Sequence, residues 1–273
     1  MTSKPIFGRA LAALAVSLAL SAPTLAAQCG GDFATFIAAM SREAAAQGIS
    51  QNTIQSAFAG VTHDPATITF DRRQRGTFRM NFEEYARTRV APYRITKGKQ
   101  MLARHAALLA RIEQQFGVPR FVIVAIWGLE SEYGAGDLGK LPVVRVVATL
   151  AHDCRRTELF QGELLAALKI VDRGDLTLND LRGAHAGEIG QTQFLPSSYI
   201  KYGVDYDGNG HVDLRHSVPD VLASTANLLK VNGWKAGAPF GEGTANFDVM
   251  REWNRAMIYR QAIVLFAERL QGR

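Results

Sequence analysis

A glutamate at the end of the most apolar helical segment is the residue best suited to chemistry. The segment reads "FVIVAIWGLESEY", and on a helix Ile126, Glu130 and Tyr133 fall on one stripe. Glu132 lies about 200° around the helix from Glu130, so the two acids do not face one substrate together. Apolar surroundings raise the pKa of a carboxyl group, which makes it a proton donor near neutral pH, as cleavage of a glycosidic bond requires. The alternative is a structural glutamate bound by a backbone amide or an arginine.

A second group of polar residues has the spacing of a calcium loop. In "DYDGNGHVD", the EF-hand ligand positions one, three, five and seven are taken by Asp205, Asp207, Asn209 and, through its carbonyl group, His211. Gly210 takes the sixth position, where such a loop turns sharply. Position twelve is His216 instead of a bidentate glutamate, so a complete EF-hand is absent. We expect a weak calcium site over residues 205–220, or a metal-free loop held by Asx turns.

Helical periodicity dominates the elements that must position these groups. Apolar residues recur at helix spacing in most segments, including residues 33–48, 50–60 and 119–134. Residues 95–117 form one long amphipathic pattern, which predicts a single helix. Convincing strand patterns are few, and "ATITFDR" is the best of them. The sequence therefore predicts a mainly α chain with at most a small β element.

Two stretches are less regular than the rest. Residues 62–95 are rich in arginine and predict an extended arm lying on the helical body, with its arginines either solvated or part of a groove. Residues 183–217 are polar and rich in glycine. Long irregular segments inside a compact domain tend to be functional, so we expect part of a site there.

The composition and the first residues indicate an exported protein. The chain has 273 residues and a formal net charge of +6, which suits an anionic polymer, although ordinary solubility explains the charge equally well. Residues 1–27 have the pattern of a secretory signal peptide, in which the basic residues Lys4 and Arg9 come first, an apolar run follows and small residues end the segment. The apolar run is too short to span a bilayer, so it is not a membrane anchor. We expect residues 28–273 to be one catalytic region in the periplasm, with no transmembrane segment. Cys29 and Cys154, the only cysteines, either form a disulfide there or stay unpaired.

Five motifs together resemble a known family. They are "WGLESEYG", the pair "RR", "GQTQFLPSSY", "DYDGNGHVD" and "WNRAMIY", in that order, and the resemblance covers about residues 33–269. The chain is similar to the lytic murein transglycosylases of the B type. The resemblance implies a mainly α, lysozyme-like catalytic core with irregular loops. It also implies cleavage of the bond between N-acetylmuramic acid (MurNAc) and N-acetylglucosamine (GlcNAc) in peptidoglycan, with attack by the 6-hydroxyl group of MurNAc and formation of a 1,6-anhydro end.

The resemblance assigns roles to individual residues. Glu130 matches the catalytic acid and base, and one carboxyl group serves both steps, unlike the two acids of ordinary glycosidases. Positions that match substrate-binding residues of the family are Tyr85, Arg155, Arg156, Gln193, Phe194, Asn254 and Tyr259. Asp220 matches the acid that closes the calcium loop. From the residues alone, Tyr85 is equally a core or surface tyrosine, and the arginine pair is equally surface charge at a helix start.

The chain departs from the family pattern around "GAHAGEIG". Ala184 stands where relatives have a serine, and His185 follows where they have an aromatic residue. Glu188 replaces an apolar residue. If its carboxylate reaches the cleft, like-charge repulsion would raise the pKa of Glu130, or the carboxylate would position a water molecule; the simpler interpretation places it on a loop surface.

We therefore expect a lytic transglycosylase that binds peptidoglycan glycan strands. The alternatives are a muramidase, in which water attacks, and a non-catalytic protein that binds the cell wall. No cofactor is expected to be required, and any Ca²⁺ would be structural. Proteins of the cell-wall machinery are candidate partners, whereas no module for nucleic-acid binding is indicated.

Overall fold

Helices make up almost all of the regular structure in the computed structural model, which describes residues 27–73 and 80–272. The α-helices are α1 (Phe33–Ala46), α2 (Gln51–Phe58), α3 (Pro65–Arg73), α4 (Phe82–Arg89), α5 (Pro92–Arg104), α6 (Ala106–Phe116), α7 (Arg120–Ser131), α8 (Val143–His152), α9 (Thr157–Asp172), α10 (Pro196–Tyr202), α11 (Val218–Val231), α12 (Ala245–Val249) and α13 (Met257–Gln271). A 3₁₀ helix, η2 (Met250–Glu252), precedes α13. The prediction of a mainly α fold is confirmed. None of the described helices is both long enough and apolar enough to span a membrane.

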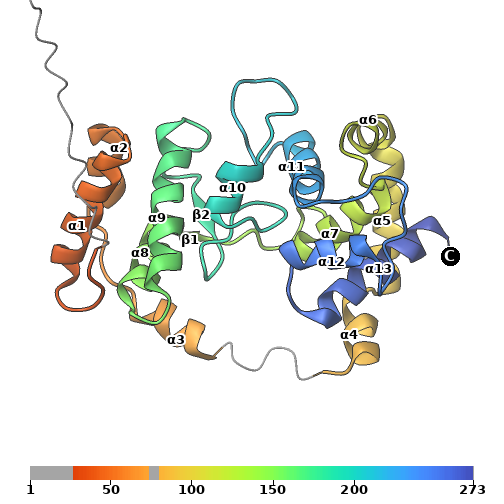
Figure 1. Cartoon of the computed structure of the whole chain (residues 1–273), viewed down its shortest axis with the longest axis horizontal. Coiled ribbons are helices and arrows are strands. Elements are labelled where there is room, and N and C mark those ends of the chain that lie inside the picture. Colours follow the sequence, from red (N-terminus) through yellow and green to blue (C-terminus); the bar gives the residue numbers. More distant parts are fainter. Residues whose placement is uncertain (1–26, 74–79, 273) are drawn as a thin grey trace, which may run out of the picture.

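α7 is the central helix of one half of the molecule, in which helices from both halves of the sequence meet. Each residue from Val122 to Leu129 is buried, so this helix is covered on all sides and not along one stripe. Helices α5, α6, α11 and α13 pack around it, as Figure 1 shows. Because its whole surface is held by neighbours, the position of its last turn is fixed.

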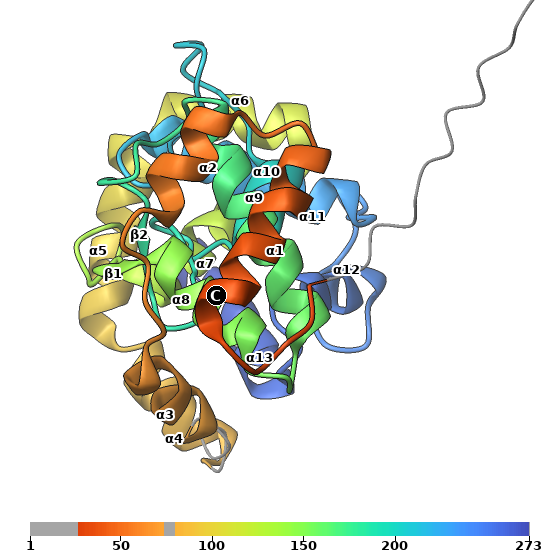
Figure 2. The same cartoon turned by 90° about the vertical axis from the view of Figure 1, so that its left-hand side faces the viewer.

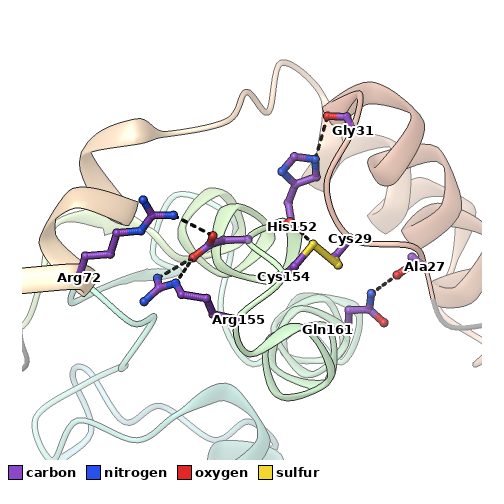
Figure 3. The surroundings of a disulfide bond; sticks show 9 residues. Ala27, Cys29, Gly31, Arg72, His152, Cys154, Arg155 and Gln161 are labelled. Carbon is purple, nitrogen blue, oxygen red and sulfur yellow. Dashed lines mark hydrogen bonds and ion pairs between the residues drawn. A yellow bond between two sulfur atoms is a disulfide. The ribbon is translucent and has the colours of Figure 1, made fainter.

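The other half of the molecule is built on α8 and α9, which pack against each other. Helices α1 and α2 cover this pair from the outside (Figures 1 and 2). A disulfide between Cys29 and Cys154 joins the residues before α1 to the turn between α8 and α9 (Figure 3). Of the two alternatives for the cysteines, the disulfide is thus confirmed. The predicted signal peptide falls, except for residue 27, outside the described residues.

Where the structure describes it, at residues 62–73 and 80–95, the arginine-rich segment is largely helical and not an extended arm. It contains α3 and α4, and the prediction of a strand at "ATITFDR" is wrong because these residues form α3. β-branched residues favoured a strand, but Asp64 accepts hydrogen bonds from the Ala66 amide at 3.1 Å and the Thr67 hydroxyl at 2.9 Å and so starts a helix. α3 packs on α8 and α4 packs on α13, and both project from the same edge of the body (Figures 1 and 2).

The predicted single helix over residues 95–117 is two helices. α5 ends and α6 begins at His105, which has φ −106° and ψ 23°. The His105 ring meets the edge of the Trp127 ring of α7, with centroids 5.9 Å apart. The break follows from tertiary packing, because it lets both helices contact α7.

A small sheet holds the glycine-rich loop beside the end of α7. β1 (Leu141–Pro142) pairs antiparallel with β2 (Arg182–Gly183). Two further bridges, Gly183 with Ile189 and Ile189 with Phe194, fold residues 183–194 back on themselves. The sequence allowed for a small β element but did not place it here, and this sheet positions the loop that carries Glu188 and Gln193.

Candidate active site

Glu130 lies in the last turn of α7, at the wall of a cavity of about 460 Å³. The cavity lies between the loop of residues 183–194, the start of α9 and the segment before α13. Its lining residues are Glu130, Arg156, Leu159, Phe160, Ala186, Glu188, Thr192, Gln193, Phe194, Leu195, Ser198, Leu228, Glu252, Trp253 and Asn254. Five residues predicted for the site therefore converge on one cavity: Glu130, Arg156, Gln193, Phe194 and Asn254.

Two donors bind the same oxygen atom of the Glu130 carboxyl group. Trp253 Nε1 donates to Oε1 at 2.9 Å, and the Tyr259 hydroxyl donates to Oε1 at 2.5 Å. Within the described residues no donor reaches Oε2, yet Glu130 is not among the side chains with a sealed, unpartnered atom. Oε1 is thus held in place, while Oε2 is left open to the cavity and is the atom free to exchange a proton.

The surroundings favour the protonated form of Glu130. Burial raises the pKa of its carboxyl group, and this effect outweighs the hydrogen bonds from Tyr259 and Trp253 and the positive charge of Arg89, all of which lower that pKa. The negative charge of Glu188 adds a further increase. Burial and the nearby Glu130 charge also raise the pKa of Tyr259 well above its ordinary value, so its hydroxyl stays a donor. A carboxyl group with a raised pKa keeps its proton to higher pH, which is the property that a general acid needs.

The aromatic and amide side chains form the walls beside Glu130. The Phe194 and Trp253 rings meet edge to face, with centroids 5.4 Å apart. Gln193 sits on the turn of the glycine-rich loop with φ 54°, and its Nε2 donates to the Gly190 carbonyl at 2.8 Å. Asn254 accepts a hydrogen bond from the Ala256 amide at 2.9 Å, in the turn that starts α13.

Tyr85 and Tyr259 lie behind Glu130 and not along the cavity wall. Both are buried, and neither lines the cavity in the described part of the chain. Tyr85, on α4, is close enough to Glu130 for the glutamate charge to raise its pKa, although burial has the larger effect. These positions suit residues that act on the carboxyl group and not on a bound ligand.

The arginine pair bonds to α3. Arg155 Nη2 donates to Asp71 at 2.6 Å and Arg156 donates to the other Asp71 oxygen. Arg155 also binds Asp153 at 2.6 Å, and Arg72 binds Asp153 from α3, as Figure 3 shows in part. Only Arg156 of the two lines the cavity, so it is the one placed to meet an anionic group there.

Three acids of the predicted calcium loop form a cluster. A carboxylate oxygen from each of Asp205, Asp207 and Asp220 lies within 4.8 Å of the others. Asp205 accepts hydrogen bonds from the amides of residues 208, 209 and 210, which lower its pKa, whereas burial raises the pKa of Asp220. His216 instead pairs with Asp213 at 2.9 Å. Several carboxylates on one loop are the donor set that a hard cation such as Ca²⁺ prefers.

A family model described as "Transglycosylase SLT domain" matches residues 32–244 of the chain. The chain belongs to the SLT transglycosylase family. It is 38% identical to membrane-bound lytic murein transglycosylase B of Escherichia coli over 155 residues, or 56% of this chain and 42% of that protein. The match thus spans less than half the length of this relative.

Solved structures of the SLT transglycosylase family share the fold. SltB3 from Pseudomonas aeruginosa, solved in complex with NAG-NAM-pentapeptide, superposes with a TM-score of 0.83 and 32% identity over 89% of this chain and 81% of SltB3. The same protein was solved with NAG-anhNAM-pentapeptide. Slt35 from Escherichia coli in complex with calcium has a TM-score of 0.76 and 24% identity over 90% of this chain and 96% of that one. The predicted family and its fold are confirmed.

Of the three residues predicted from the sequence as departures from the resembled family, Ala184, His185 and Glu188, only Glu188 lines the cavity in the described part of the chain. Glu188 lines the cavity together with Glu130, so the simpler interpretation, a place on the loop surface, is wrong. Its Oε2 accepts a hydrogen bond from the Ala186 amide at 2.9 Å. His185 stacks on Phe70 of α3, with centroids 3.5 Å apart. The residues that differ from the family thus change the charge at the wall and the contact with α3.

Sequence reasoning missed two residues of the SLT transglycosylase site. Trp253 belongs to the "WNRAMIY" motif but was not among the predicted site residues, yet its indole binds the Glu130 carboxyl group. The positive charge of Arg89 lowers the pKa of that group, and Arg89 donates from Nη2 to the Leu129 carbonyl at 3.3 Å. Trp253 had a sequence signal, since it begins the "WNRAMIY" motif, whereas Arg89 had none beyond its place in an arginine-rich segment.

Proposed function

We propose that the protein is a lytic transglycosylase that cleaves the MurNAc–GlcNAc bond of peptidoglycan and leaves 1,6-anhydromuramoyl ends. The observation that carries the proposal is the asymmetric Glu130 carboxyl group, with Oε1 held by two donors and Oε2 open to the cavity. The names of the relatives, which are murein transglycosylases, agree with it.

One carboxyl group is sufficient for both steps of this reaction. Protonated Glu130 gives its Oε2 proton to the glycosidic oxygen, the bond from that oxygen to C1 of MurNAc breaks, and the GlcNAc side leaves as an alcohol. The resulting carboxylate then takes the proton from the 6-hydroxyl group of MurNAc, and the oxygen of that hydroxyl group bonds to C1 of the same sugar. Glu130 ends protonated, so no water is consumed and the acid is regenerated. The donors on Oε1 stabilise the carboxylate formed between the steps.

The substrate contacts follow from the cavity walls. Gln193 and Asn254 offer amides to N-acetyl and hydroxyl groups, and Phe194 with Trp253 forms an apolar wall for a sugar face. Arg156 is placed for the carboxylates of the lactyl group or the stem peptide, with Arg155 bound to the same Asp71 carboxylate. Tyr85 and Tyr259 act on the substrate through Glu130.

A muramidase is the second candidate, and Glu188 is the observation that favours it. A carboxylate at the same cavity wall as Glu130 can accept a proton from a water molecule. If that water attacked C1 in place of the 6-hydroxyl group, the product would have a reducing end. A protein that only binds the wall is disfavoured, because binding gains little from a partly buried acid.

Digestion of purified peptidoglycan tests the three alternatives. Mass spectrometry of the released muropeptides gives anhydro ends for the transglycosylase and reducing ends for the muramidase, and no release means a binding protein. Glu130→Gln is expected to lower the rate by about 10²–10⁴, the range for loss of a general acid. Glu252→Gln, which changes another carboxyl group at the cavity, is the control. Equal activity of the Glu130 variant and the wild type would place the acid elsewhere.

Calcium binding at residues 205–220 is proposed as structural support. Asp205, Asp207 and Asp220 would hold the ion through carboxylates, with Asn209 and the His211 carbonyl group completing the set. The complex of Slt35 with calcium is consistent with this. An ion there would offset the repulsion between the three acids, and no step of the reaction runs through it.

The location proposed for the enzyme is the periplasm, where its polymer substrate lies. Residues 1–27 would be removed as a signal peptide, leaving residues 28–273 as one catalytic region bound to glycan strands and open to contacts with the cell-wall machinery. The disulfide supports an oxidising compartment. Fractionation of cells that produce the full chain, with mass determination of the mature N-terminus, tests both points.

A further inference from the structure

The residues that follow Glu130 adopt an unusual backbone conformation. Glu132 has φ 52° and ψ 42°, and Tyr133 has φ 65°. Two consecutive residues with side chains are therefore in the left-handed region, which disfavours them on steric grounds. Such a conformation persists only where the surroundings hold it in place.

Three side chains of α5 hold Glu132. Arg94, which is 8% exposed, donates from Nη2 to Glu132 Oε1 at 2.6 Å. The Tyr93 hydroxyl donates to the same oxygen at 3.0 Å, and Lys97 Nζ donates to the Glu132 carbonyl at 3.0 Å. α5 packs beside α7 (Figure 1), so these contacts join the first half of one helix to the end of the other.

Tyr133 adds a further hydrogen bond between the end of α7 and α5. Its hydroxyl donates to the Arg94 carbonyl at 2.7 Å. A Cβ atom on Gly98 of α5 would lie 2.5 Å from the Tyr133 hydroxyl oxygen, and one on Gly128 of α7 would lie 2.7 Å from it. The ring thus occupies a space that exists because both helices have glycine where the ring packs against them.

Arg94 connects this contact to the surroundings of the acid. Its Nη1 donates to the Arg89 carbonyl at 2.9 Å, and Arg89 in turn binds the Leu129 carbonyl at 3.3 Å. The charged and titratable groups that face Glu130 are Arg89 and Tyr85 from α4, Glu188 from the loop and Tyr259 from α13. Neither Arg94 nor Glu132 lines the cavity in the described residues.

We infer that the Arg94–Glu132 ion pair is a positioning device for catalysis, which holds the last turn of α7 and the backbone of Arg89 so that Glu130 meets its two donors and the substrate. The inference rests on the proposed function for its kinetic consequence. The pair acts through Glu130 and makes no contact with the cavity. Misplacement of a reacting group by about 1 Å can cost about a hundredfold in rate.

A double variant separates positioning from stability. Glu132→Gly alone would leave the buried Arg94 charge unpaired, which destabilises the fold. Glu132→Gly with Arg94→Met removes that charge and supplies a residue that favours φ above zero. This variant should fold with nearly the wild-type Tm and still lack the ion pair.

The opposite end of α7 supplies a matched control. Arg120, its first residue, binds Glu113 at 2.5 Å, with both side chains about one-third exposed. Glu113→Gln with Arg120→Met breaks an ion pair on the same helix, about 15 Å from the end that carries Glu130. It should leave kcat within twofold of the wild type.

Kinetics and hydrogen exchange of the full chain test the inference. For the Arg94 and Glu132 double variant we expect kcat for muropeptide release to fall about tenfold with KM within twofold, and amide exchange over residues 128–134 to become about tenfold faster. Unchanged kcat and unchanged exchange, or equal losses in the control, would overturn the inference. Hydrogen exchange does not depend on activity. If the wild type released no muropeptide while the double variant still exchanged faster, the proposed function would be rejected and the role of the pair in holding the helix end would stand.

Discussion

Replacing Tyr259 by phenylalanine isolates one of the two hydrogen bonds on the Glu130 carboxyl group. The ring stays in its buried position, and the substitution removes the hydrogen bond from the hydroxyl group to Oε1 at 2.5 Å. Trp253 continues to donate to the same oxygen at 2.9 Å. Oε2 still faces the cavity, so the variant retains its proton donor and changes only the strength of that acid.

The size and sign of the effect follow from this geometry. Hydrogen bonds to charged groups contribute about 1.5–3 kcal/mol, and because Trp253 remains bound we take the lower limit, about 1.5 kcal/mol, or about tenfold in kcat. In the wild type this hydrogen bond lowers the pKa of Glu130 against the larger effect of burial. Its loss therefore raises that pKa. Since Glu130 must be protonated to donate, activity is lost as the pH rises through its pKa, and this limb of the profile should move to higher pH.

The assay is the rate of muropeptide release from peptidoglycan, measured as kcat from about pH 4 to pH 9, a range that brackets ordinary and raised carboxyl pKa values. Tyr199→Phe is the matched control, because Tyr199 is also buried and its hydroxyl donates to the Val212 carbonyl away from the cavity. The control should lose stability without moving the limb. A limb that stays in place, or moves to lower pH in the Tyr259 variant, would refute the assignment of Oε1 as the supported oxygen.

Four further changes have expected outcomes. Glu188→Gln removes a charge that raises the pKa of Glu130, so the falling limb of the pH profile should move to lower pH and the fraction of reducing ends should decrease, as mass spectrometry of the products measures. Glu130→Gln should raise Tm at pH 7, because a folded-state pKa above the unfolded value destabilises the fold at high pH; the gain should shrink near pH 4, where both states are protonated. Serine at both Cys29 and Cys154, which close a loop across 125 positions, should cost about 5 kcal/mol in urea unfolding. Calcium at about a hundredfold excess over Kd should stabilise the wild type by about 2.7 kcal/mol in thermal unfolding, and Asp207→Ala should abolish this gain.

The place of Glu130 was predictable because the signal is local. Eight apolar or small residues precede it on one buried helix, and a helix of that composition must lie inside the core. Glu130 lies in the last turn of this helix, where the helix reaches the edge of the core. The same reasoning does not extend to Glu132, because α7 ends at Ser131 and Glu132 pairs with Arg94 from a left-handed backbone conformation.

The partners of Glu130 were not predictable from periodicity. Trp253 and Tyr259 lie 123 and 129 positions away along the chain, and no local rule indicates which atoms will meet over such distances. The prediction of a single helix over residues 95–117 was wrong for the same reason, since the break at His105 depends on packing against Trp127. The prediction of a strand in place of α3 was wrong because the β-branched composition of "ATITFDR" was given more weight than the cap at Asp64.

The segment with the least regular sequence contacts both sides of the site. At one end, Asp71 of α3 binds the arginine pair, of which Arg156 lines the cavity. At the other end, Arg89 of α4 is the positive charge beside Glu130. A single stretch of chain thus sets the charge at the substrate wall and at the acid, and α3 and α4 lie along one edge of the molecule (Figure 1). A change in the position of this edge would therefore alter the substrate wall and the charge beside the acid together.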